Sequence, residues 1–188
     1  MPRHVTKERN SVVFLCAVIL MFVVASSVRG AVTSIGGGKG WVLETKESQY
    51  VISVTAERTV INSWWGSKLA KGDHELRPMH LPPFSDGPAR QEYAGWGGMY
   101  YAEPSLKVRF ADGNRDLRLR FQTAEMRENE LILNLRDEHY PFEVALHYRV
   151  VAEHDLIERW AEIRNKGTEA VRLGQVGSAL WHLPRRED

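Results

Sequence analysis

The sequence contains little cysteine: one residue among 188, Cys16, lies inside an apolar run at positions 12–25. If that run is removed with a leader, the remaining chain can form no disulfide and has no cysteine for catalysis or metal binding. Long apolar runs are lacking as well, because these fourteen residues are fewer than the roughly 20 of a transmembrane helix. The stability of the remaining chain must therefore come from its packed core.

Positions 1–30 have the order of a secretory signal peptide. Basic residues come first, the apolar run follows, and small residues lie where cleavage is expected, after Ser27 or after Gly30. We therefore predict a cleaved signal peptide over 1–30 and export to the periplasm or the cell exterior. No membrane association is expected after cleavage.

The predicted mature chain also lacks an excess of positive charge. Removing 1–30 takes four of the 25 basic and one of the 24 acidic side chains, which leaves a net charge of about −2 on 158 residues. A chain without a basic excess is a poor partner for nucleic acid or anionic membranes. Its length suits one domain.

Alternating apolar and polar residues, rather than a helical period, predict the fold. Short runs such as 131–135 and 142–150 alternate, and turn signals fall every 8–15 residues, for example at Asp112-Gly113 and at 165–167. This spacing is typical of an antiparallel β-sandwich, so the fold class is all-β. Positions 156–163 could pass for a helix, but the hairpin tip that follows favours a strand. We expect a flexible lead-in at 31–40 and a long loop at 70–89.

The densest group of aromatic residues and glycines lies between Arg90 and Gly113. Rings on loops suit stacking on sugars and suit subunit contacts equally well, and such a loop can also fold over its own core. A second aromatic pair, Trp64 and Trp65, ends a predicted strand. Adjacent side chains on a strand point to opposite faces, so one should pack inward, and the outward one is the better binding candidate.

The sequence contains no recognisable motif of catalytic or metal-binding residues. The six histidines beyond position 30 have no metal-ligand spacing, and no serine lies in a nucleophile motif. Four carboxylates lie near the aromatic stretch, and a pair of them could in principle hydrolyse a glycoside. The four are Glu92, Glu103, Asp112 and Asp116. Three of them have a simpler local role, since Asp112 lies in a turn, Asp116 at a strand start and Glu103 before a proline. We expect no catalytic residue, metal site or cofactor.

Several motifs occur together in an order that resembles a known family. They are WWGSKL (64–69), RQEY (90–93), EPSLKV (103–108), ADG (111–113), LHYRV (146–150), IRNKG (163–167) and SALWHLP (178–184). The sequence from 41 to 184 is similar to the N-terminal β-sandwich domain of family 36 glycoside hydrolases, the α-galactosidases or melibiases. The resemblance implies a sandwich of the supersandwich type followed by a (β/α)8 barrel that carries both catalytic aspartates.

The resemblance also sets the functional expectation. No residue here matches a catalytic position, and 185–188 would be the truncated start of a linker to the barrel. The chain would support and border the active site of a secreted α-galactosidase-like enzyme, with the barrel supplied in cis or in trans. Candidate residues for bordering substrate or docking the barrel are Trp64, Trp65, Trp96, Met99, Tyr100 and Tyr101. The alternatives are a stand-alone exported carbohydrate-binding module, with galactosides as possible ligands, and a remnant without function. The aromatic loop could also support a homo-oligomer.

Overall fold

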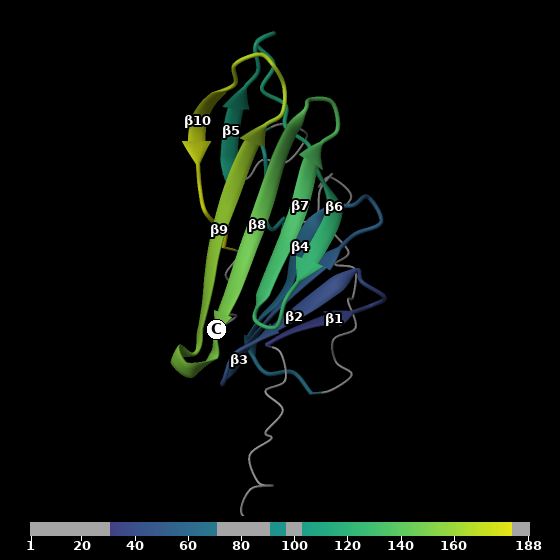
Figure 1. Ribbon diagram of the computed structural model, residues 1–188, viewed down its shortest axis with the longest axis vertical. Coiled ribbons are helices and arrows are strands. Elements are labelled where there is room, and N and C mark those ends of the chain that lie inside the picture. The colour runs from purple at the N-terminus through teal and green to yellow at the C-terminus, as the bar shows by residue number, and fades with distance from the viewer. Residues whose placement is uncertain (1–30, 71–90, 97–102, 182–188) are drawn as a thin grey trace, which may run out of the picture.

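Two four-stranded antiparallel sheets form the two layers of a sandwich, and a two-stranded sheet lies at one end of it (Figure 1). The structure is a computed structural model that describes residues 31–70, 91–96 and 103–181. The first sheet has the order β1-β2-β3-β4, the second β6-β7-β8-β9, and the small sheet β10-β5. The strands are β1 (Val32–Ile35), β2 (Gly40–Glu44), β3 (Ser48–Val54), β4 (Val60–Ser67), β5 (Leu106–Arg109), β6 (Leu119–Met126), β7 (Glu130–Asp137), β8 (Phe142–Val151), β9 (Leu156–Asn165) and β10 (Arg172–Val176).

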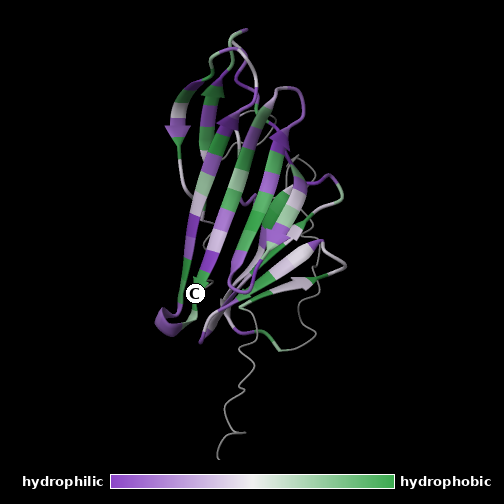
Figure 2. Cartoon of the chain, in the orientation of Figure 1, coloured by the Kyte–Doolittle hydropathy of each residue, from purple (hydrophilic) through white to green (hydrophobic). Residues whose placement is uncertain are grey.

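The predicted all-β sandwich is thus confirmed, and its physical basis is the alternation along the strands. Figure 2 shows hydrophobic and hydrophilic residues alternating along β7, β8 and β9. Leu131 and Leu133 on β7 pack against Leu146 and Tyr148 on β8 at the centre of the core, and all four are buried. Positions 156–163, where a helix was the alternative, lie in β9. A single short 3-10 turn, η1 (Ala152–His154), is the one helical element of the described residues, and none of their helices has the length and apolarity of a membrane span.

The flexible lead-in predicted at 31–40 is instead part of the sheet. Val32 is buried, and β1 pairs with β2 along its whole length. The turn between the two strands, 36–39, contains Gly36, Gly37 and Gly38, all with positive φ, and the Gly38 N–H donates to the Ile35 carbonyl at 3.2 Å. Glycine adopts this conformation without steric penalty, so the run that looked like a linker is a hairpin turn.

The Asp112-Gly113 turn is present, but the strand before it does not pair with the strand after it. Gly113 has φ +90°, and its N–H donates to the Phe110 carbonyl. The preceding strand, β5, pairs with β10 more than sixty residues later in the sequence. Local turn signals therefore located the chain reversal correctly without identifying the pairing partner.

A short segment, 91–96, connects the first sheet to the small one. Gln91 forms an antiparallel bridge to Ile61 on β4, and Gly95 forms a parallel bridge to Leu106 on β5. At Gly95 an added Cβ would lie 2.4 Å from the backbone oxygen of Leu117, so the close approach of these two segments requires glycine. The segment places Glu92 between the two large sheets.

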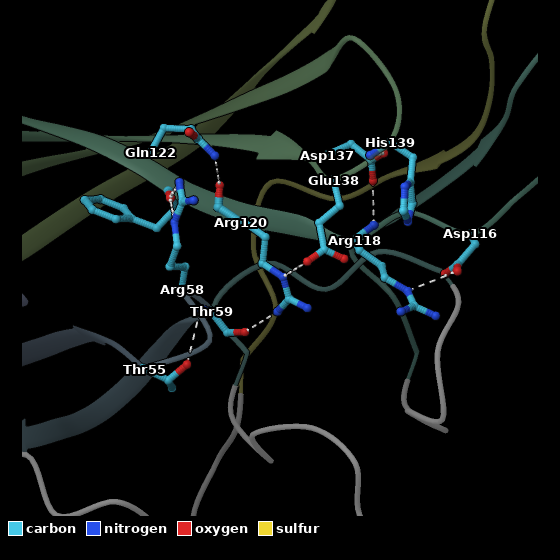
Figure 3. Close-up of polar contacts among 11 residues, drawn as sticks. Thr55, Arg58, Thr59, Asp116, Arg118, Arg120, Gln122, Asp137, Glu138 and His139 are labelled. Atoms are coloured by element: carbon cyan, nitrogen blue, oxygen red, sulfur yellow. Dashed lines mark hydrogen bonds and ion pairs between the residues drawn. The ribbon is translucent and has the colours of Figure 1, made fainter.

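A polar cluster joins the β3–β4 loop to β6 (Figure 3). The Arg58 side chain donates from Nε and Nη2 to the Phe121 carbonyl at 2.9 and 2.6 Å, and the Phe121 N–H donates back to the Arg58 carbonyl. Nearby, Arg120 donates to the Thr59 hydroxyl at 2.8 Å and pairs with Glu138. These contacts tie the two sheets together and cover the edge of β6.

Candidate functional site

Three aromatic side chains meet at one end of the sandwich: Tyr50, Trp65 and Trp181, here called the aromatic cluster. Tyr50 on β3 is directly opposite Trp65 on β4, with ring centroids 6.5 Å apart. Trp181 comes from the far end of the described chain, and its ring centroid lies 4.8 Å from that of Trp65 and 6.0 Å from that of Tyr50. Trp65 and Trp181 remain 43% and 48% exposed, so the cluster presents an apolar surface to solvent.

A β-bulge decides which tryptophan belongs to this cluster. Val51 pairs with Trp64 while Ile52 pairs with Asn62, which leaves Ser63 as an extra residue in β4. Continuing the alternation from Val60 and Asn62 would put Trp64 on the core-facing side, but the extra residue puts Trp65 there instead. Trp64 and Trp65 do lie on opposite faces, as predicted. Trp65 faces inward but is 43% exposed because it lies at the end of the sandwich, whereas the outward Trp64 is half-buried.

Trp64, on the other face, is half-buried and held locally. Its indole N–H donates to the Ser67 carbonyl at 3.1 Å. A Cβ on Gly66 would lie 3.1 Å from its ring, so the ring lies against the glycine. These contacts make Trp64 a structural residue of the β4 end.

Beneath the aromatic cluster lies a buried charge cluster of Glu92, Arg159, Tyr50 and Tyr148. The Glu92 side chain is fully buried and accepts hydrogen bonds from the hydroxyls of Tyr50 at 2.8 Å and Tyr148 at 2.7 Å. Arg159 Nη1 lies 2.9 Å from Glu92 Oε1, Nη2 donates to the Glu92 carbonyl, and the Arg159 side chain is 3% exposed. A buried charge of this kind is tolerated only when it is paired and hydrogen-bonded.

Burial and the Glu92 carboxylate keep both tyrosines of this cluster protonated. Desolvation, and after it the charge of Glu92, raises the pKa of Tyr50 above its ordinary value. Desolvation also raises the pKa of Tyr148, although the positive charge of Arg159 opposes this shift. Tyr93 donates its hydroxyl to the Gly177 carbonyl, and burial raises its pKa to about 12. All three phenols therefore act as hydrogen-bond donors and not as bases near neutral pH.

The two clusters enclose a pocket of about 160 Å³. Aromatic rings, one cation and a few small or polar residues line it: Ser48, Tyr50, Trp65, Tyr148, Asp155, Leu156, Ile157, Arg159 and Trp181. The Arg159 guanidinium carbon lies 5.7 Å from the Trp181 ring centroid and 5.4 Å from that of Tyr148. Such a pocket can bind a flat apolar or partly polar group.

Each of the four carboxylates considered from the sequence has a partner of its own. Glu92 is occupied in the core, Glu103 pairs with Lys107, Asp112 accepts from the Tyr140 hydroxyl at 2.6 Å, and Asp116 pairs with Arg118. No contact brings any two of them together within the described residues. In the same part of the chain, no group of histidine, cysteine and carboxylate side chains could hold a metal ion.

Trp96 is 46% exposed, as expected for a candidate binding residue, and the ammonium group of Lys107 lies 5.3 Å from its ring centroid. No ring contact joins Trp96 to the aromatic cluster among the residues that the structure describes. Three further candidates, Met99, Tyr100 and Tyr101, lie outside the described residues, as do positions 1–30, most of the predicted loop and 182–188.

The sequence pattern of the glycosyl hydrolase family 36 N-terminal domain matches residues 58–188, about 70% of the chain. The chain belongs to this family. The matched range includes Trp65, Glu92, Arg159 and Trp181, so both clusters are built largely from residues of the family domain. No curated protein is significantly similar to the chain over its sequence.

Solved structures agree with this assignment at the level of the fold. The galactosidase domain of the α-galactosidase–sucrose kinase AgaSK superposes with a TM-score of 0.71 at 23% identity, over 79% of this chain and 25% of that chain. The family 36 α-galactosidase AgaB from Geobacillus stearothermophilus gives 0.64 at 22% identity, over 79% and 24%. The α-galactosidase from Lactobacillus brevis gives 0.63 at 17%, over 74% and 23%. The chain thus spans about a quarter of the length of these proteins.

Sequence reasoning missed Trp181 and Arg159 as parts of the site. Arg159 had a detectable signal, because it occupies a core-facing position between Ile157 and Ala161 on a strand of apolar inward residues. A charged residue at such a position indicates a buried partner. Trp181 had no comparable signal, since its partners Tyr50 and Trp65 are more than a hundred residues away.

Proposed function

We propose that this chain is the non-catalytic N-terminal sandwich of an α-galactosidase-like glycoside hydrolase and that the aromatic cluster docks a catalytic barrel. The observation that carries the proposal is the uncovered apolar end formed by Trp65, Trp181 and Leu156, which are 43%, 48% and 48% exposed. Large side chains of this kind, gathered on one surface, are typical of a surface that another domain covers. The family membership and the length of the similar α-galactosidases support a barrel as that domain.

The barrel would supply all the chemistry in this proposal. In this proposal the sandwich would bind, orient and shield, and a galactoside would contact it only at the margin of the barrel's site. The barrel can be in cis, as in a longer polypeptide, or in trans, as a separate chain. The N-terminal segment 1–30 supports export of the domain to the periplasm or the cell exterior.

The first test is the mass of the native gene product in the producing cells, detected with an antibody against the sandwich. A band several times heavier than 158 residues would support a barrel in cis and make α-galactoside hydrolysis the activity to assay. A band of the mature size calls for copurification with a separate barrel chain. If neither a heavier band nor a copurifying barrel is found, the docking proposal is refuted.

One observation favours a second candidate, a stand-alone carbohydrate-binding module. The pocket beside Trp65 and Trp181 offers ring faces for stacking and polar groups at Ser48, Asp155 and Arg159. Titration with an α-galactoside would then change the tryptophan fluorescence of the wild type and of Trp64→Phe, but not that of Trp65→Ala. An unchanged spectrum in the wild type would exclude this candidate.

A further inference from the structure

The strand β9 has a long, regular and unpaired edge. It forms ten consecutive pairs with β8 without a bulge and contains no proline. On its other side, no strand pairs with it, and no backbone hydrogen bond from a described residue reaches it. Figure 1 shows β9 as the last strand of its sheet. A flat edge of this length is a template for the addition of another strand.

The other sheet edges are short, bulged or covered. β1 has four residues, and β10 has a bulge between Leu173 and Gln175. The β4 edge receives the segment 91–96, through the bridge from Gln91 to Ile61. The β6 edge has its own bulge after Phe121 and is covered there by Arg58 (Figure 3). Among the described residues, β9 therefore has the one long edge without any of these protections, and it is open to pairing with another strand.

The outward face of β9 carries charges in a pattern that fits a second copy of the same strand. Glu158 pairs with Arg149 on β8, which is itself opposite Glu130 on β7, so the signs alternate across the sheet as negative, positive, negative. At the other end of the strand, Arg164 forms its ion pair with Glu162 on the same strand, and it lies opposite Glu143, which is opposite Arg136, so the signs across the sheet are positive, negative, positive. The two rows have opposite signs.

We propose that two copies of this chain associate through their β9 edges, antiparallel, with Ala161 opposite the partner's Ala161. In this register Glu158 lies beside the partner's Arg164, and the alternation of charge continues unbroken across both sheets. Shifting the centre by one residue in either direction places Glu162 beside the partner's Glu158 or beside the partner's Glu162, and like charges directly opposite each other are unfavourable. The two sheets then form one sheet of eight strands.

The core-facing side of the strand suits the same arrangement. Ile157, Ala161 and Ile163 alternate on this face and are only half-buried within one chain. Apolar side chains at a sheet edge gain burial when the sheet is extended. The register places the small Ala161 at the two-fold axis, where it meets its copy without crowding. This surface is distinct from the aromatic loop that the sequence suggested for a homo-oligomer.

Charge reversal tests the register. The purified wild-type chain is expected to sediment as a dimer at micromolar concentrations. Glu158→Arg and Arg164→Glu, each alone, place two like-charge pairs in the interface and should weaken the dimer by about tenfold or more. An equimolar mixture of the two variants restores opposite charges at both positions, so it should form a heterodimer. A monomeric wild type, or single variants that dimerise as well as the wild type, would overturn the proposal.

A crosslink tests the axis independently. Directly opposite residues of an antiparallel pair have Cα atoms about 4.5–5.5 Å apart, which lies within the range of a disulfide. In a chain with Cys16→Ser, Ala161→Cys should therefore oxidise to a covalent dimer. The matched control is Ala124→Cys on the exposed far edge, β6, where the two copies would lie roughly 30 Å apart and should stay monomeric on a non-reducing gel. Equal crosslinking of both variants would contradict the assigned edge.

Discussion

Replacing Arg159 by methionine should be among the most destabilising single changes in this domain. The substitution keeps much of the side-chain volume but leaves the fully buried Glu92 carboxylate without its cation. At an effective dielectric constant of about 20, two unit charges at the observed 2.9 Å attract each other by roughly 6 kcal/mol. Desolvation of both groups offsets part of this, and removing one partner of a buried pair typically costs about 3–5 kcal/mol.

We therefore expect Arg159→Met to lower the free energy of unfolding by about 3–5 kcal/mol, a large share of the total for a domain of this size. The two tyrosine hydroxyls still donate to Glu92 in this variant, which favours the lower half of that range. The assay is urea unfolding followed by tryptophan fluorescence. In a thermal scan the loss corresponds to a melting temperature roughly 10 °C lower.

A matched control separates burial from the loss of a charge. Arg118→Met removes an arginine of a partly exposed ion pair, with Asp116, and should cost less than about 1 kcal/mol. The double variant Glu92→Gln with Arg159→Met leaves a neutral amide that still accepts from the tyrosines. It should therefore be more stable than the sum of the two single changes predicts, by about 2 kcal/mol or more. An Arg159→Met cost no larger than the control, or additive single changes, would refute the reasoning.

Three further predictions concern the two tyrosines of the same cluster, Gly95 and Asp137. Because the pKa values of Tyr50 and Tyr148 are raised in the folded state, their contribution to stability is complete below pH about 10. Above that pH it is lost by about 1.4 kcal/mol per pH unit for each tyrosine. The urea midpoint should therefore fall between pH 9 and 11, and this fall should be smaller in Tyr148→Phe. Gly95→Ala forces a Cβ against the Leu117 carbonyl and should cost about 3 kcal/mol or more, measured by urea unfolding, whereas a neutral result would mean that the segment 91–96 yields easily. Asp137→Ala removes the acceptor of three backbone N–H groups and should cost about 3 kcal/mol in the same assay, with Asp137→Asn milder because the amide keeps one acceptor oxygen.

The strands were predictable from the sequence because their signal is local. In the second sheet the alternating runs at 131–135 and 142–150 became strands. The turn signal at 165–167 lies at the end of β9, but the expected hairpin is wrong, because β10 pairs with β5 and not with β9. The failures come from features that depend on distant partners. The pairing of β5 with β10 joins segments more than sixty residues apart, and no pattern within either strand specifies the other. The glycine run 36–38 has the composition of a linker as well as that of a turn, and the pairing of β1 with β2 decides between them.

At the candidate site, too, the sequence could not predict a feature that depends on a neighbouring strand. The sequence identified Trp64 and Trp65 as candidates and predicted that they face opposite ways. It could not indicate which one lies in the site, because a single bulged residue, Ser63, reverses the alternation between Val60 and the tryptophans. Bulges carry no reliable local signal, since the extra residue becomes apparent only in the register with the neighbouring strand.

The position of the buried charge cluster beneath the aromatic cluster links the stability of the domain to the proposed docking surface. Tyr50 belongs to both clusters: its ring packs against Trp65 and Trp181, and its hydroxyl donates to Glu92. Arg159 likewise pairs with Glu92 and lies against the Trp181 ring. A substitution in the Glu92–Arg159 ion pair is therefore expected to change the packing of Tyr50 and Arg159 against the exposed tryptophan rings. Trp65→Ala, by contrast, leaves the Glu92–Arg159 ion pair in place, so a loss of docking in that variant while it remains folded would assign the contact to the ring itself.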